Sequence, residues 1–154
     1  MITREDVEKM VQAGDLLRKL DLSGLDLSGI DFGGAIFESN KAHGTSFIGC
    51  KLKEASFVES DFSGADFSGA NLNLAAFVNM NLENAKLSGA NLSAAKFAET
   101  KLAKADLTGV KTTMAMFAQC SLAGASFKET LIDRIMMAKT SLAGVDLRGA
   151  TIRE

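Results

Sequence analysis

The dominant feature of this chain is a pattern of apolar and polar positions that repeats every five residues from Leu20 to Glu154. In a frame centred on Leu22, this stretch forms 27 consecutive pentads without an insertion or a deletion. The middle residue is Leu, Phe, Ile or Met in 25 pentads, and all ten phenylalanines occupy it; Ala42 and Thr112 are the exceptions. The residue two places earlier is Ala in 12 pentads, and the last place holds 12 of the 14 glycines.

A period of five excludes the two common regular structures, because a helix repeats about every 3.6 residues and a strand every second residue. A chain that turns one corner per pentad satisfies the pattern, and an internal repeat of this kind predicts a solenoid. Phe37, Phe57, Phe77, Phe97 and Phe117 recur at every fourth pentad. Four pentads per coil would stack these five rings in one column, so we predict a four-sided all-β solenoid of about seven coils, roughly 30 Å long.

A short helix is expected over residues 3–13, ahead of the repeats. Thr3 can cap it with Asp6 three places on, and Val7, Met10 and Val11 form one apolar stripe. Eleven residues are too few for a stable isolated helix, so the helix should pack on the first coil and cover the end of the solenoid. We therefore assign residues 1–19 to a capping helix and lead-in, and residues 20–154 to a single β-helix domain.

The glycines predict where the corners differ. Taking every fourth pentad as one face of the solenoid, the faces centred on Leu22 and Leu27 carry glycine at most corners, whereas the face centred on Phe37 carries none. Glycine suits the positive φ of a type II turn, so we expect type II corners on the first two faces and a different turn on the Phe37 face. The pentads 40–44 and 110–114 lack the large middle residue and are interpreted as degenerate repeats, with a local bulge as the alternative.

Several segments resemble the repeating unit of the pentapeptide-repeat family. They are Ala-Asp-Phe-Ser-Gly at 65–69, Ala-Asn-Leu at 70–72 and 90–92, and Ala-Asp-Leu-Thr-Gly at 105–109. The resemblance extends over residues 20–154. It implies a right-handed quadrilateral β-helix, with the middle and small residues inside and the other three positions outside.

Composition and charge narrow the cellular setting. The chain has no apolar run near the about 20 residues of a membrane span, and charged residues occupy the place of a signal-peptide core, so we expect a cytoplasmic protein without membrane partners. The net charge is −2, which predicts no direct binding of nucleic acid. Cys50 and Cys120 lie more than three coils apart, too far for a disulfide, and are typical of buried thiols in a reducing compartment.

No constellation of residues indicates catalysis, a cofactor or a bound metal. The only histidine, His43, is expected on the outside without a ligand or base partner, and no serine–histidine–aspartate set, phosphate loop or zinc spacing is present. The regular aspartates at the second pentad position follow from the repeat. A rigid rod also lacks the concave pocket of most enzymes, so we expect no enzymatic activity.

An apolar strip on the Phe37 face and its border is the best candidate site for binding another protein, because exposed apolar area marks such contacts. The alternative is that aliphatic residues simply suit β-like faces. The open C-terminal coil is a second apolar region, and it suggests an end-to-end homodimer, a docked partner or a longer chain. The candidate protein-binding residues are Ile36, Val58, Leu74, Val78, Met114, Met116 and Met136.

The function expected from these features is a non-catalytic protein-interaction module or scaffold. The helix followed by residues 22–29 is similar to pentapeptide segments of bacterial type VI secretion accessory proteins, which suggests an adaptor role. The alternative is a DNA mimic of the kind that binds DNA gyrase and confers fluoroquinolone resistance, although the small net charge and the missing C-terminal dimerisation helix depart from that pattern. A structural spacer or an enzyme-associated module is a third interpretation. The acidic patch for a mimic would be Asp21, Asp26, Asp31, Glu59, Asp61 and Asp66.

Overall fold

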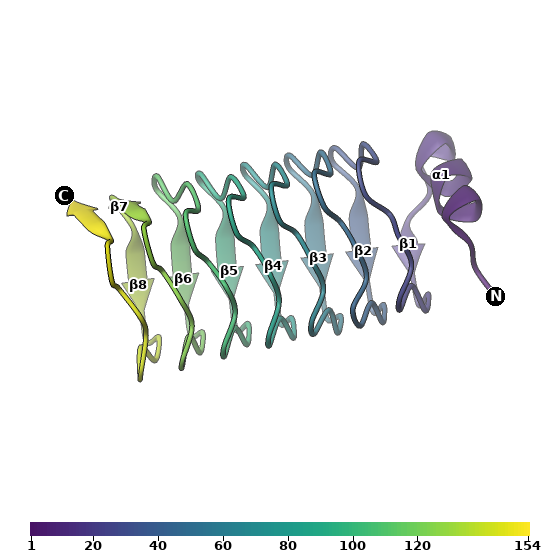
Figure 1. Ribbon diagram of the computed structural model, residues 1–154. Helices are drawn as coiled ribbons and strands as arrows, with labels where there is room; N and C mark the ends of the chain where they lie inside the picture. The colour runs from purple at the N-terminus through teal and green to yellow at the C-terminus, as the bar shows by residue number, and fades with distance from the viewer.

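The computed structural model describes residues 1–154 and shows a parallel β-solenoid with one helix at its N-terminal end (Figure 1). Strands β1 to β6 and β8 form a seven-stranded sheet along one side, in that order, and β7 pairs with β9 in a second small sheet. No helix has the length and apolar character that a membrane span requires. The elements are α1 (Arg4–Ala13), β1 (Leu17–Arg18), β2 (Ile36–Glu38), β3 (Ser56–Val58), β4 (Ala76–Val78), β5 (Lys96–Ala98), β6 (Met116–Ala118), β7 (Leu131–Asp133), β8 (Met136–Ala138) and β9 (Thr151–Arg153).

Each coil contains four pentads, as the spacing of the phenylalanines predicts. Phe37 pairs with Phe57 in the sheet, and Phe57 with Phe77, always in the parallel sense. The other faces are held by single bridges with the same separation, such as Asp21 with Lys41 and Lys41 with Asp61. The predicted four-sided β-helix of about seven coils is therefore confirmed. One further pentad, residues 15–19, precedes the 27, because Leu17 pairs with Phe37.

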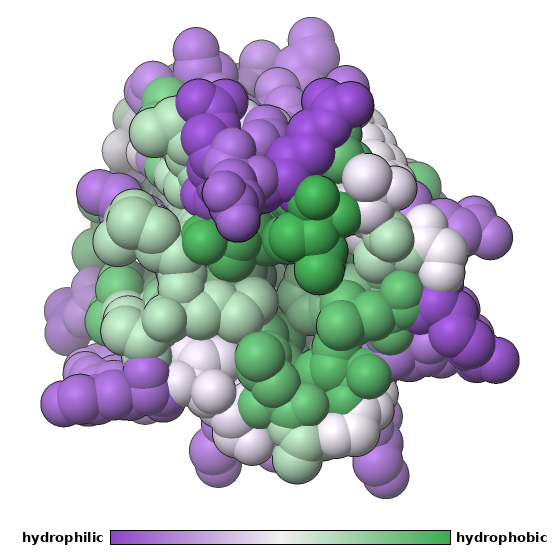
Figure 2. Space-filling view, turned by 90° about the vertical axis from the view of Figure 1, so that its left-hand side faces the viewer, coloured by the Kyte–Doolittle hydropathy of each residue, from purple (hydrophilic) through white to green (hydrophobic).

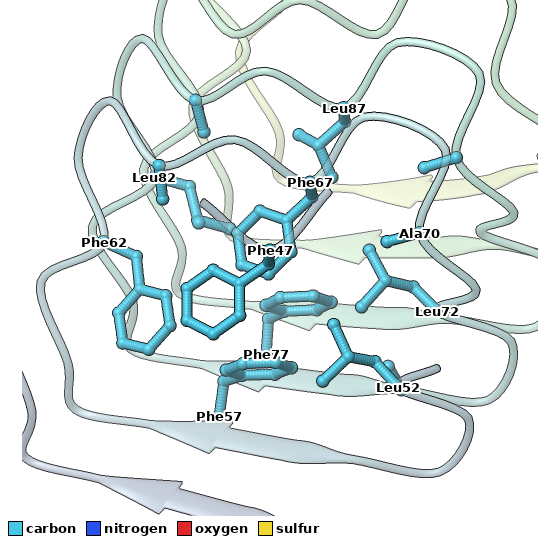
Figure 3. Packing of buried hydrophobic residues seen from close by; sticks show 14 of the residues in the cluster. Phe47, Leu52, Phe57, Phe62, Phe67, Ala70, Leu72, Phe77, Leu82 and Leu87 are labelled. Carbon is cyan, nitrogen blue, oxygen red and sulfur yellow. The ribbon is translucent and has the colours of Figure 1, made fainter. Parts of the chain in front are cut away.

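The interior is built from the middle and small positions of the pentads. All ten phenylalanines are at most 1% exposed, and the column from Phe37 to Phe117 stacks with ring centroids 4.5–4.7 Å apart. Phe47 and Phe67 stack similarly at 4.9 Å on the Leu27 face, as Figure 3 shows beside Phe57 and Phe77. Stacking is possible because parallel strands lie about 4.8 Å apart, close to the contact distance of two aromatic rings.

The two pentads without a large middle residue, 40–44 and 110–114, do not interrupt the solenoid. Ala42 is fully buried, and the ring of Phe62, one coil later on the same face, lies 5.5 Å from Phe47 and keeps the aromatic core continuous. At Thr112 the hydroxyl donates to the carbonyl of Leu131. The next pentad on that face forms strand β7 instead of a tight turn, so the change in side chain coincides with a change of corner.

Three of the four corners are tight turns. On the Leu22 face, Leu25 N–H donates to Leu22 O at 3.1 Å, and Gly24 has φ 71°, the signature of a type II turn. The Leu27 and Phe32 faces repeat this arrangement, so the predicted type II corners are confirmed and extend to a third face. The Phe37 face differs as expected: Ser39 has φ 55°, and no turn hydrogen bond closes the corner.

We call the corner that follows the Phe37 face the open corner, because no turn hydrogen bond closes it. Polar side chains replace the missing hydrogen bond there. Asn40 N–H donates to Ser60 Oγ of the next coil at 2.9 Å, and Met80 N–H donates to Thr100 Oγ1 at 3.3 Å. A buried N–H without a partner is costly, by about 1–3 kcal/mol. This requirement explains why the small inner residue at this corner is often Asn, Ser or Thr, while the corners with a turn bond favour Ala.

Helix α1 covers the N-terminal end of the solenoid. The capping box between Thr3 and Asp6 is present, and Gly14 ends the helix with φ 72°. Val7 is fully buried in the core, and Arg4 donates to the carbonyls of Asp26 and Ser28 at 3.1 and 3.0 Å. The expected helix and its packing on the first coil are therefore confirmed.

The aromatic column should be the largest single contribution to stability. Phe77→Ala removes a ring from the middle of the stack, and the resulting cavity should lower the free energy of unfolding by about 3–5 kcal/mol. Phe77→Leu keeps most of the volume and should cost about 1–2 kcal/mol. Chemical denaturation followed by circular dichroism measures both, and equal losses for the two variants would contradict a role for ring stacking and volume.

Candidate protein-binding surface

The outer side of the seven-stranded sheet, which we call the sheet face, is the most apolar side of the solenoid. Its strands are three residues long except β1, and the residues before and after each middle position point outward. On the Leu22, Leu27 and Phe32 faces, the same positions carry mainly Asp, Asn, Ser, Thr and Lys. On the sheet face, ten of the fourteen are apolar: Leu16, Ile36, Val58, Ala76, Val78, Ala98, Met116, Ala118, Met136 and Ala138.

The register arranges these residues in two columns. The column after the middle position is continuous, since Val58 pairs with Val78, and Ala98, Ala118 and Ala138 follow in the next coils. The column before it ends with Met116 beside Met136. The charged members are Lys96 in this second column, and Arg18 and Glu38, which form an ion pair at 3.4 Å.

Leu74 and Met114 extend the sheet face around its border. Both occupy the last position of a pentad on the Phe32 face, with φ 61°, a region that a side chain with a Cβ adopts at a cost of about 1–2 kcal/mol. Gly34 occupies the same position in an earlier coil. Leu74 and Met114 are also 47% and 54% exposed. Two large apolar side chains are thus held in an unfavourable backbone conformation and directed toward solvent.

The structure brings most of the predicted strip together. Leu74, Val78, Met114 and Met136 are exposed, and Val58 and Met116 are partly exposed. Ile36 is exposed as well, but Ser56, Ala76 and Lys96 separate it from Met116 in its column. It lies instead in a hollow of about 220 Å³ beside α1, with Val11 and Leu16.

The predicted acidic patch is not a continuous surface. Asp21 and Asp61 lie on the Leu22 face with Lys41 between them. On the Leu27 face, Ser46 separates Asp26 from Asp66. Two further members are on other sides of the rod: Asp31 lies on the Phe32 face next to Lys51, and Glu59 lies at the open corner.

The aspartates at the second pentad position have a structural role in the corners. Ser23 N–H donates to Asp21 Oδ1 at 3.1 Å, and Ser28 N–H donates to Asp26 Oδ1 at 3.0 Å. Asn71 Oδ1 accepts a hydrogen bond from Asn73 N–H in the same way. This shared role explains why either Asp or Asn occupies this position in many pentads. Hydrogen bonds from Ser23 and Ser28 lower the pKa of Asp21 and Asp26 below the usual range.

His43 has neighbours that the sequence interpretation missed. Its Nδ1 lies 2.8 Å from Ser63 Oγ and 3.6 Å from Asp61 Oδ1. The signal was available, since residues 43 and 63 are one coil apart. The hydroxyl and the carboxylate approach the same ring nitrogen, whereas a catalytic triad needs one on each nitrogen. The arrangement therefore indicates surface hydrogen bonding instead of nucleophile activation.

The two cysteines are free and buried. Burial raises the pKa of the Cys50 thiol to about 11, and it also raises the pKa of Cys120. A thiol reacts through its thiolate, so neither side chain is suited to nucleophilic or redox chemistry near neutral pH.

The C-terminal end of the solenoid exposes the middle residues of the last coil. Figure 2 looks onto this end and shows an apolar centre surrounded by polar side chains. Leu142 is 49% exposed and Ile152 68% exposed. The end contains a hollow of about 250 Å³ whose lining is entirely apolar: Phe127, Ile132, Met137, Leu142, Val145, Leu147 and Ile152.

Comparison with known proteins agrees with this geometry. The family profile described as "Pentapeptide repeat region" matches residues 30–107, which is more than half of the chain. The chain belongs to the pentapeptide-repeat family. No curated protein sequence matches this pentapeptide-repeat protein.

Two solved structures show which proteins share the fold. Trypsin-treated QnrB1, a plasmid-mediated fluoroquinolone resistance protein, is 21% identical with a TM-score of 0.69; the match covers 86% of this chain and 72% of QnrB1. A pentapeptide repeat protein from the thylakoid lumen of Arabidopsis thaliana is 36% identical with a TM-score of 0.51, covering 61% of this chain and 69% of that protein. The QnrB1 identity is low, so that likeness shows the fold alone.

The corner aspartates predict a loss of stability in acid. Because the folded-state pKa of Asp21 and Asp26 is lowered, their stabilisation is present above the ordinary pKa of about 3.9 and is lost as the pH falls through the folded value. The melting temperature should therefore fall as the pH decreases below about 4. The Asp21→Asn/Asp26→Asn variant keeps the side-chain oxygens that accept the turn hydrogen bonds but cannot be protonated in this range. Its melting temperature should therefore depend less on pH than that of the wild type. An unchanged pH dependence would contradict the role given to Asp21 and Asp26.

Proposed function

We propose that this pentapeptide-repeat protein is a non-catalytic interaction module that binds another protein through the sheet face. The observation that supports this most directly is the contrast between faces. Ten of fourteen outward positions are apolar on the sheet face, whereas the same positions elsewhere are mainly polar. Parallel sheets are normally covered on both sides, and the interior covers only one side of this sheet.

The binding mode follows from how the sheet face is built. Its backbone N–H and C=O groups are used between successive coils, so a partner meets side chains only. Association would remove apolar area from water, and such contacts depend little on ionic strength. The rigid array of coils would hold the contact residues in place before binding, which limits the entropy lost on association.

The DNA-mimic alternative requires a continuous negative surface that binds a positively charged groove. The lysines between the acidic residues, such as Lys41 between Asp21 and Asp61, weaken this alternative. It stays open as an outcome of the binding experiment below. A role in type VI secretion stays a prediction from the N-terminal sequence alone.

The first experiment compares two variants in a pull-down from the source-cell lysate at about 0.1 M and 0.5 M NaCl. Val58→Asp/Val78→Asp/Met116→Asp introduces charge into the sheet face and spares the core. Ser88→Asp/Ser93→Asp/Ser121→Asp adds the same charge on the three other faces. We expect a partner that the wild type and the serine variant retain at both salt concentrations and the sheet-face variant loses.

Other outcomes would redirect the assignment. Recovery of DNA gyrase subunits only at low salt, equally by wild type and sheet-face variant, would establish the DNA-mimic alternative. Equal capture by all three proteins at high salt would place the binding site elsewhere on the molecule.

We further propose that a second copy of the chain occupies the open C-terminal end. The apolar centre of this end is wide (Figure 2), while α1 covers the opposite end. Only two C-terminal ends can therefore meet, which produces a closed pair instead of a filament.

Sedimentation of residues 1–154 over a range of concentrations should show a monomer–dimer equilibrium. Leu142→Glu/Leu147→Glu places charges in the apolar centre and should leave only monomer, whereas Ser141→Glu on the exposed rim should still dimerise. Circular dichroism would verify that each variant is folded. A wild-type protein that remains monomeric at the highest concentration would overturn this proposal.

A further inference from the structure

We propose that the occupant of the sheet face is an amphipathic α-helix of the partner protein, lying along the solenoid axis and anchored at Leu74 and Met114. This inference rests on the proposed function and adds the secondary structure and charge pattern of the partner. The predicted contact area for this helix extends from β3 to β8. It includes the two outward columns and the border that carries Leu74 and Met114.

The dimensions of the sheet face match those of a helix. Strands of three residues make a face about 10 Å wide, which is the diameter of a helix with its side chains, about 10–12 Å. From β3 to β8 the sheet has five strands, because β7 lies outside it. The four spacings between these strands give a length of about 19 Å, which about 13 helical residues span. One helical turn rises about 5.4 Å and one coil about 4.8 Å, so each turn of the helix meets about one new coil.

The two borders of the sheet face differ, which gives the helix an orientation about its own axis. On one border, Leu74, Ala94 and Met114 are apolar. On the other, Glu59, Asn79 and Glu99 follow one another along the open corner and line the same shallow hollow. A partner helix should therefore turn its apolar stripe toward the sheet and the Leu74 border, and carry Lys or Arg on the flank that meets Glu59 and Glu99.

Lys96 adds a second electrostatic requirement. It stands in the outward column between Ala76 and Met116 and forms no ion pair within the chain. Covering this ammonium group with apolar atoms would be costly unless a carboxylate meets it. The helix should thus present one Asp or Glu near the middle of its apolar stripe.

Leu74 and Met114 are assigned as anchors because they are the two large apolar side chains at this corner, and both are exposed. Other residues with a Cβ also adopt a positive φ at this corner, such as Glu54 and Ala94, and Asn84 shows that Asn fits the equivalent corner of the Leu22 face with φ 58°. The two apolar side chains lie two coils apart, about 10 Å, which corresponds to positions i and i+7 of a helix. Methionine adapts its shape to an apolar partner at small cost, as at other binding grooves that receive helices.

Addition of a β-strand is excluded as the mode of binding on this face. The sheet exposes unpaired backbone groups only at its first and last strands, β1 and β8, and not along the face. Recognition must therefore depend on side chains at regular intervals, and the i, i+3, i+4, i+7 spacing of a helix supplies them.

The test uses two phage-displayed peptide libraries of about 18 residues, one of amphipathic helices and one of extended, proline-containing sequences. Both are selected against the wild-type protein at about 0.5 M NaCl. We expect binders from the helical library, with apolar residues at helical spacing and an acidic residue near the centre. Leu74→Asn/Met114→Asn should weaken their binding about tenfold or more, and the matched Ala94→Asn should weaken it less than about twofold.

The double variant should remain folded, since Asn tolerates the positive φ of this corner, and its circular dichroism spectrum checks this. If it does not fold, Leu74→Ala/Met114→Ala provides the same comparison. Lys96→Glu should change the preferred central residue of the selected helices from acidic to basic.

The outcomes separate this inference from the proposed function. Selection of extended peptides only, or of helices insensitive to Leu74→Asn/Met114→Asn, would overturn the helical partner. The proposed function would still stand if the Val58→Asp/Val78→Asp/Met116→Asp variant lost its salt-resistant partner. The absence of binders from either library, together with no capture by the wild type, would overturn both.

Discussion

Parallel hydrogen bonding between residues one coil apart fixes the distance between coils, and the rest of the structure depends on this distance. The bonds run in both directions, as when Lys41 N–H donates to Leu20 O at 2.9 Å and Ala42 N–H donates to Asp61 O at 2.8 Å. The spacing is close to the contact distance of stacked rings, so identical side chains in successive coils pack face to face. The aromatic core is therefore a consequence of the backbone ladder, and any side chain that recurs at every fourth pentad forms a column.

The corners explain why one side of the solenoid became a sheet. Three corners are closed by a turn hydrogen bond, which leaves each of those faces with a single bridging residue. The corner after Phe37 has no such bond, so three residues remain extended and pair as strands. The donors released at this corner are bound by Ser60, Thr100 and Thr140 from the following coils. A continuous sheet and a column of buried polar residues thus have the same cause.

The same column geometry decides how charge is distributed. Acidic residues that are close in the sequence lie on different faces, and those that share a face are separated by one coil, with Lys41 or Ser46 in between. Corner aspartates also accept backbone hydrogen bonds, which gives them a role within the chain. The other three faces are mainly polar. The sheet face and the C-terminal end remain as the apolar surfaces on which the proposed function rests.

The sequence by itself determined the architecture. A strict period of five with phenylalanine recurring at every fourth pentad defines the number of faces, the inward positions and the aromatic core. The reason is that the residues that become buried follow the same period of five along the chain. The capping helix was readable from Thr3, Asp6 and its apolar stripe. Contacts between coils were decided only by the tertiary structure. Lys41 between two aspartates, Ser63 beside His43, and the strained, exposed Leu74 and Met114 depend on which side chains become neighbours and on the φ of each corner, and one pentad viewed alone determines neither.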